Sequence, residues 1–223
     1  MRLIDVIGPV MIGPSSSHTA GAARLGGLAR RIWGKPVSRV AIFLRGSFAA
    51  TYKGHGTDLA LVGGLAGMLP DDPRIRDSFR EAKDAGICWE MKSETVDGAH
   101  PNSVRFLFSD DSGEEMEIIG SSIGGGAVVL TGIDGFSLKL SGELAAIVTF
   151  HRDEPGVVAA VGGALSKAGR NIASLNLHRQ GRGGNAAMVI ELDDRDIDGL
   201  EPLIKATHPA ITRVLAIPGG GEN

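Results

Sequence analysis

Cysteine is almost absent from this 223-residue chain, and its scarcity limits the metal chemistry that the chain can perform alone. Cys88 is the only cysteine. A single thiol excludes an internal disulfide and any metal site built from several thiolates of this chain. If an iron–sulfur cluster takes part in the function, its thiolates must therefore come from another polypeptide.

Runs of like charge and long apolar segments are missing as well. The net charge is −3 and no stretch is rich in lysine or arginine, so nothing indicates a nucleic-acid partner. The longest apolar stretches are short and interrupted by glycine, which argues against a membrane span. The N-terminal sequence MRLIDVIGPV lacks the apolar core and cleavage site of a signal peptide. We therefore expect a cytoplasmic protein.

The composition and the length of the chain indicate a globular protein of one or two domains. Hydrophobic residues make up 43% of the chain and charged residues 22%, which is typical of a soluble fold rather than a disordered one. Glycine occurs 33 times and is often clustered. Such clusters allow unusual backbone angles and a close approach of the backbone to a ligand.

Residues 143–223 predict a ferredoxin-like domain. Two strands are expected to meet across the glycine-rich turn at residues 180–185, which has the composition of a hairpin. Asp194 is a candidate N-cap for the second helix, whose apolar face would include Leu203. The elements expected are strands at residues 144–151, 172–179, 186–192 and 212–217, and helices at 156–167 and 196–206. This βαββαβ order describes an antiparallel sheet with two helices on one face.

Residues 1–140 predict a mixed α/β domain, so that the fold class of the chain is α+β. The apolar periodicities predict helices at residues 17–33, 57–68 and 72–85, and strands at 37–44, 86–91, 104–109, 115–120 and 127–131. We expect the domain boundary between residues 133 and 142. Cys88 falls in an apolar strand and is expected in the core.

The densest polar cluster is the serine loop (residues 13–19), which stands directly before the first predicted helix. It contains Ser15, Ser16, Ser17, His18 and Thr19. Free amides and the dipole at a helix start attract anions, so a substrate carboxylate would suit this loop. A plain N-cap needs only one of the three serines. On spacing alone, both interpretations stay open.

A second cluster, the histidine loop (residues 53–58), precedes the next predicted helix. Glycines on both sides leave the ring of His55 uncrowded, and imidazole titrates near neutral pH, so His55 could accept or donate a proton. An ordinary surface histidine is the alternative. The loop lacks the spacer and the Gly-Lys-Ser/Thr ending of a phosphate-binding loop, which argues against nucleotide binding.

Two weaker clusters follow along the chain. The HPN turn (residues 100–102) offers an imidazole and an amide beside a proline, and the glycine turn (residues 121–126) could present backbone amides to a ligand. The glycine turn is equally consistent with a bulged connection between strands.

Together these motifs resemble a known family. Residues 5–21, which include the serine loop, closely resemble the start of the β subunit of bacterial two-chain L-serine dehydratases. The other three clusters look like further signatures of that subunit, in the same order. The resemblance extends over essentially the whole chain and includes a C-terminal segment similar to an ACT regulatory domain.

This resemblance implies a subunit of an L-serine ammonia-lyase that converts L-serine to pyruvate and ammonia. A partner α subunit would hold a four-iron four-sulfur cluster through its own cysteines, no metal ligand would come from this chain, and no pyridoxal phosphate would be needed. His55 is the first choice for proton transfer. Further catalytic residues would be His18, Lys53 and Asp58, and substrate-binding residues would be Ser15, Ser16, Ser17, Thr19, His100 and Asn102. Tyr52 departs from the pattern, because a small residue is expected before Lys53.

The resemblance also implies an effector site in the ACT-like segment. Residues Asp153, Glu154, Pro155 and Gly156, with Asn171 and Ile172, would bind serine or a monovalent cation such as potassium, often at a homodimer interface. A purely structural dimerisation module is the alternative for this segment. For the whole chain, the alternatives are a non-catalytic amino-acid sensor and a scaffold for the cluster-bearing subunit.

Overall fold

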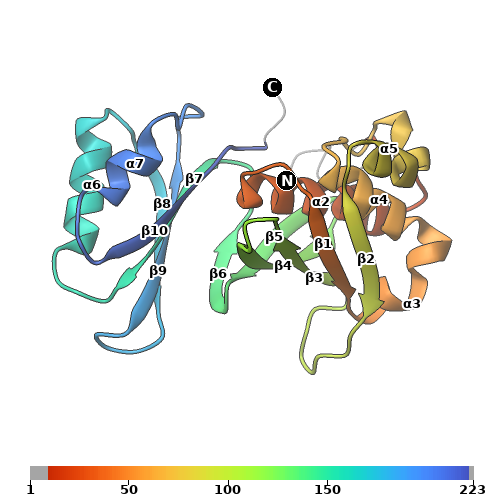
Figure 1. Cartoon of the computed structure of the whole chain (residues 1–223), viewed down its shortest axis with the longest axis horizontal. Coiled ribbons are helices and arrows are strands. Elements are labelled where there is room, and N and C mark those ends of the chain that lie inside the picture. The colour runs from red at the N-terminus through yellow and green to blue at the C-terminus, as the bar shows by residue number, and fades with distance from the viewer. Residues whose placement is uncertain (1–9, 221–223) are drawn as a thin grey trace. The chain divides into compact units, whose positions relative to one another are not determined.

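The computed structural model describes residues 10–220, and the chain divides into two compact units at Gly135 and Phe136. The first unit is a mixed α/β unit, and the second is an antiparallel sheet with helices (Figure 1). The expected α+β class is confirmed. Residues 5–9 of the opening motif lie outside the described part of the chain.

The first sheet has the strand order β2-β1-β3-β4-β5-β6, in which β1 and β2 are parallel while β1, β3, β4 and β5 pair antiparallel in succession. Its strands are β1 (Arg39–Leu44), β2 (Cys88–Ser93), β3 (Ser103–Ser109), β4 (Glu115–Gly124), β5 (Ala127–Ile133) and β6 (Phe136–Leu140), the strand that begins at the division. The helical segments of this unit are η1 (Ser16–Gly21), α2 (Ala22–Trp33), α3 (Gly46–His55), α4 (Thr57–Leu65), η2 (Pro73–Asp77) and α5 (Ser78–Asp84).

The core of the first unit lies between one face of its sheet and the helices. Alternate residues of β1 and β3 are buried, as expected for strands with one face on a core. Trp33 of α2 stacks on Phe108 of β3 with ring centroids 5.4 Å apart. Helices α2 and α4 cross closely at Gly26 and Gly64, where a Cβ atom would lie 2.3 and 2.1 Å from a backbone carbonyl oxygen of the other helix. Any larger residue at these two positions would push the helices apart.

The sequence did not predict α3 or β6. Helix α3 contains glycine, threonine and serine and buries only Phe48, so it has no apolar stripe of its own. Tertiary contacts stabilise its first turn, because the Phe48 amide donates to the Pro101 carbonyl at 3.2 Å. Consequently the histidine loop does not lie entirely at a helix start: its first half is the last turn of α3, and its second half begins α4.

The second unit has the ferredoxin-like arrangement that the sequence predicts. Its antiparallel sheet has the order β10-β7-β9-β8, and α6 and α7 lie on one face of it (Figure 1). The elements are β7 (Ala145–Arg152), α6 (Val157–Lys167), β8 (Ile172–Arg179), β9 (Asn185–Leu192), α7 (Leu200–Lys205) and β10 (Ile211–Ile217).

Two local predictions in this unit are wrong. Helix α7 begins at Leu200 after Gly199, so Asp194 does not cap it; the Asp194 carboxylate instead accepts a hydrogen bond from the Asn171 amide at 3.3 Å. Leu203 is 42% exposed rather than on the buried face, because the buried side of α7 is formed by Leu200 and Ile204, one turn apart. Asp194 therefore ties together the two loops at one end of the sheet.

Candidate active site

The serine loop enters a helix that starts with a π turn. Ser15 is the N-cap residue: its hydroxyl accepts a hydrogen bond from the His18 amide at 3.2 Å, and its carbonyl accepts one from the Thr19 amide at 2.8 Å. Ser16 and Ser17 follow in the first turn and are partly exposed. One serine thus has the expected capping role, which leaves the other two hydroxyls outside that role.

The ring of His18 is held on both of its nitrogen atoms. Nε2 lies 3.1 Å from the Ser47 hydroxyl, and Nδ1 lies 3.5 Å from the Ser15 hydroxyl. The edge of Phe48 packs against the ring at a centroid distance of 5.2 Å. Burial lowers the pKa of His18 below its ordinary value, and the nearby charge of His55 lowers it further. His18 is therefore a neutral imidazole at pH 7.

His55 lies beside His18 and is exposed. The two ring centroids are 5.0 Å apart, although the residues come from different helical segments. The Thr19 hydroxyl donates to the His55 carbonyl at 3.4 Å, which joins the two loops again. Gly56 follows with φ +66°, a left-handed angle that ends α3 and allows α4 to start one residue later.

A cavity of about 220 Å³ lies where the serine loop and the histidine loop meet. It is lined by Ile12, Gly13, Pro14, Thr19, Gly54, His55, Gly56, Leu59, Ile75 and Arg76. This volume is below the range of pockets for drug-sized ligands and suits a small metabolite. His55 contributes an imidazole to its wall.

A second cavity, of about 370 Å³, is also lined by His55, together with Lys53 and Tyr52. The Lys53 ammonium lies 5.7 Å from the centre of the Tyr52 ring. Asp58 lines neither cavity, and its carboxylate accepts a hydrogen bond from the Leu59 amide at 2.9 Å. The structure thus brings Lys53 near His55 and gives Asp58 a local bond in the first turn of α4.

Backbone hydrogen bonds connect the HPN turn with α3 and with the glycine turn. The Pro101 carbonyl accepts from Phe48, the residue after Ser47, and the Asn102 carbonyl accepts from the Ser122 amide at 2.9 Å. Helix η1 in turn contacts β4, which carries Ser122. All four sequence clusters therefore meet in one region. The His100 ring accepts from the Asn102 amide at 3.2 Å, and neither residue lines the two cavities.

The donor set of this chain does not fit a metal cluster. Among residues 10–220, no group of three or more histidine, cysteine, aspartate or glutamate side chains is placed to hold a metal ion. Cys88 is exposed, so its expected place in the core is wrong. It pairs with Arg39 at the start of β1, whereas the site lies beyond Leu44 at the end of that strand. The thiol is therefore about 17 Å along the sheet from the site.

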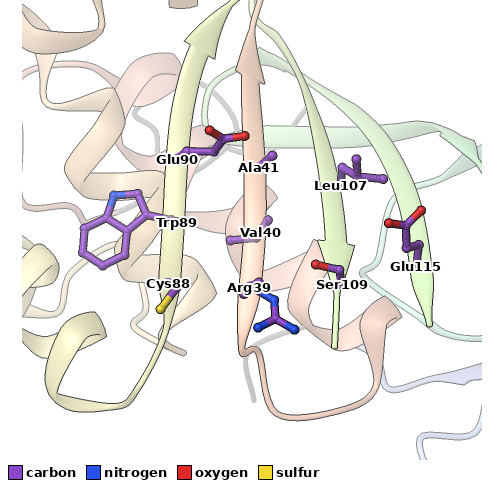
Figure 2. A pocket seen from close by; sticks show the side chains of 9 residues that line it. All are labelled: Arg39, Val40, Ala41, Cys88, Trp89, Glu90, Leu107, Ser109 and Glu115. Carbon is purple, nitrogen blue, oxygen red and sulfur yellow. The ribbon is translucent and has the colours of Figure 1, made fainter. Parts of the chain in front are cut away.

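A larger cavity of about 400 Å³ lies over strands β1 to β4, away from the four clusters. Figure 2 shows Cys88 and Glu90 from β2 beside Arg39 and Ala41 from β1. No residue of the serine loop, the histidine loop, the HPN turn or the glycine turn lines it. Its size alone does not make it the functional site.

The residues predicted for an effector site fall into two separate groups in one chain. Asp153 follows the end of β7, where it accepts from the Gly183 amide and from Arg179, both at 3.1 Å. Asn171 precedes β8, which pairs through β9 with the start of β7. Strands β7 and β8 run in the same direction, so the two groups are separated by the length of a strand, roughly 25 Å.

The sequence did not single out Ser47, Phe48 or Arg76. Ser47 and Phe48 belong to α3, which was not predicted, and their contacts with His18 span 29 or more positions along the chain. Arg76 stands in a charged stretch that resembles an ordinary solvent-exposed helix face. No local signal distinguishes it from the neighbouring arginines.

The chain is similar to known proteins over most of its length. The family model "Serine dehydratase beta chain" matches residues 4–85, and the model "ACT domain" matches residues 145–208. The chain is 44% identical over 205 residues to the "Probable L-serine dehydratase, beta chain" of Bacillus subtilis, covering 90% of this chain and 93% of that protein. It is 42% identical over 211 residues to the "L-serine dehydratase, beta chain" of Peptoniphilus asaccharolyticus, covering 94% of this chain and 92% of that protein. It is also 28% identical over 181 residues to a D-3-phosphoglycerate dehydrogenase of Synechocystis, covering 80% of this chain but 32% of that protein.

Proposed function

Because this chain belongs to the family of L-serine dehydratase beta chains, we propose that it is the β subunit of a cytoplasmic iron–sulfur L-serine ammonia-lyase. The reaction converts L-serine to pyruvate and ammonia. The observation that carries the proposal is the imidazole pair: a neutral, fixed His18 lies against an exposed His55 on the wall of a small cavity.

His55 is the proton-transfer residue in this proposal. The α-proton of an amino acid is only weakly acidic, so elimination needs a base within reach of it. His55 is exposed and borders both cavities, whereas His18 is half-buried, contacts Ser47 and Phe48 and lines neither cavity. His18 therefore packs against His55 and orients it, and Lys53 and Asp58 support the loop that carries His55.

The serine loop is the proposed binding element for the amino-acid backbone. Ser15, Ser16, Ser17 and Thr19 would bind the carboxylate and amino groups, and His100 and Asn102 would complete the pocket. Thr19 supports this assignment directly because it lines the cavity with His55. His100 and Asn102 have weaker support, since they act on the site through the backbone around Ser47.

The four-iron four-sulfur cluster is assigned to a partner α subunit. The support is the donor set: one exposed cysteine, on the strand that starts at the far end of the sheet. Hydroxide is a poor leaving group, and the α subunit would assist its departure. No pyridoxal phosphate takes part.

In this proposal residues 1–140 form the β-chain domain, and residues 143–223 form an ACT domain that regulates the enzyme. The effector is serine or potassium. The two separated residue groups, Asp153–Gly156 and Asn171–Ile172, can form one site only if two chains pair. Leu175 and Leu177 on the edge strand β8 are 39% and 43% exposed, which suits pairing of two ACT units along this edge.

A second candidate is an amino-acid sensor without catalysis. The observation that favours it is the similarity of most of this chain to one third of a D-3-phosphoglycerate dehydrogenase. A binding module needs hydrogen bonds but no proton acceptor, so the adjacent His18 and His55 favour the enzyme.

Anaerobic co-purification with a candidate α subunit tests the proposal. We expect pyruvate from L-serine when both chains are present, and no pyruvate from either chain alone. This chain purified by itself should contain no iron. Serine deamination by this chain alone, or equal activity of the α subunit without it, would contradict the proposal.

A further inference from the structure

Among residues 10–220, Arg76 is the one permanent positive charge on the wall of the cavity that His55 and Thr19 share. It lies in η2, which follows α4 and the loop after it. Two contacts fix this short helix: the Asp72 side chain caps it by accepting from the Arg74 amide, and Ile75 is 2% exposed. The position of Arg76 at the cavity therefore depends on its neighbours and not on an ion pair of its own.

The neighbouring arginines are neutralised, whereas Arg76 is not. Arg74 forms an ion pair with Asp72 at 2.6 Å, and Arg80 lies 3.3 Å from Glu81. Within residues 10–220, Arg76 makes no hydrogen bond or ion pair, and no carboxylate side chain lines its cavity. A free guanidinium in a cavity without acidic side chains is suited to an anion from solution.

We propose that Arg76 binds the carboxylate of the amino-acid substrate. A guanidinium offers two parallel N–H donors that match the two oxygens of a carboxylate. The carboxylate is bonded to the α-carbon, so a substrate held at Arg76 presents its α-proton inside the cavity that His55 borders. This inference deepens the proposed function and rests on it.

The test uses the assembled α–β complex with Arg76→Gln in this chain. Loss of a charge-assisted hydrogen bond should raise the KM for L-serine roughly 10- to 100-fold, with a much smaller change in kcat. Arg76→Lys should recover part of the affinity, because it restores charge but not the two-pronged geometry. Arg80→Gln is the matched control, since that arginine is exposed and lines no cavity near the site.

Two unreactive analogues then show whether the carboxylate is what Arg76 recognises. L-Alanine has the carboxylate and L-alaninamide does not. For the unaltered complex, the inhibition constant should be much lower for L-alanine than for L-alaninamide, and Arg76→Gln should remove most of that difference. A KM equal to that of Arg80→Gln, or an equal loss of affinity for both analogues, would overturn the inference.

Failure of the inference about Arg76 can be told apart from failure of the proposed function on which it rests. If the unaltered complex makes no pyruvate, the proposed function fails, and calorimetric binding of L-alanine to the same complex still tests Arg76. If pyruvate forms normally and the Arg76 variants bind both analogues like the control, only the inference about Arg76 fails.

Discussion

The two units of the chain differ in where their polar loops lie and in how completely their strands are buried. In the first unit, polar loops meet at helix ends around a cavity, and the hydroxyls of Thr57, Ser103 and Ser122 are buried without a hydrogen-bond partner among the described residues. In the second unit, strands β7 and β9 are buried along nearly their full length, and Arg170 Nε and His178 Nε2 are buried without a partner among the described residues. Its buried His151 ring lies 3.2 Å from the Thr149 hydroxyl.

Buried polar groups without partners cost stability, and proteins retain them mainly where function requires them. In the first unit, Thr57 belongs to the histidine loop, Ser103 follows the HPN turn and Ser122 belongs to the glycine turn. Their positions support the site proposed for this unit. The second unit is a well-packed regulatory module with an exposed edge strand.

Replacing His55 with alanine should give the largest effect. Loss of a general base lowers kcat about 10²- to 10⁴-fold, and assembly with the α subunit should persist because the ring is exposed. Pyruvate formation by the purified complex measures the effect, and His178→Ala in the second unit is the control. Near-normal turnover would show that His55 is not the catalytic base and would contradict the site proposed for the first unit.

The exposed edge of the second unit should control self-association. Lysine at both Leu175 and Leu177 puts charge on an edge strand, which opposes pairing with another strand. We expect the dissociation constant of the homodimer to rise at least about thirtyfold, the size of a single interface hot spot. Light scattering after gel filtration measures it, and Val158→Lys, on the exposed side of α6, is the control. An unchanged dimer would place the interface elsewhere.

Ser47 should have a smaller effect, because it acts through His18. Removing its hydroxyl in Ser47→Ala costs a hydrogen bond of about 0.5–1.5 kcal/mol, or roughly 2- to 12-fold in kcat. Ser47→Thr keeps the hydroxyl and should restore most of the rate. The acid limb of the pH–rate profile should also move in Ser47→Ala but not in Ser47→Thr. Equal profiles for both variants would show a role in packing only.

The smallest effect concerns the stability of the second unit at acid pH. Burial lowers the pKa of His151 in the folded protein below the ordinary 6.5. Between the folded pKa and 6.5 the unfolded chain binds more protons, so this unit loses stability as the pH falls through that window. The slope is at most about 1.4 kcal/mol per pH unit for one proton.

Urea denaturation between pH 5 and 7.5 measures this slope. His151→Gln should flatten it. If His151→Gln denatures with the same pH dependence as the unaltered protein, the titration of His151 does not govern the stability of this unit.

Much of this molecule could be predicted from local patterns. The βαββαβ order of the second unit follows from apolar periodicity and one hairpin turn, and the four polar clusters were visible as departures from what capping and turns require. Helix α3 was missed because its residues have low helical preference, and its first turn is stabilised by Pro101 from a distant strand end.

The sequence by itself determined most of the helices and strands, because their patterns depend on neighbours along the chain. It also determined the single thiol and the residue types that can do chemistry. Only the tertiary structure decided that His18 meets Ser47 and His55, that Arg76 faces their cavity, and that Cys88 is exposed. The physical reason is that these contacts join segments tens of residues apart. Their distances are set by how helices pack on a sheet, which no local pattern encodes.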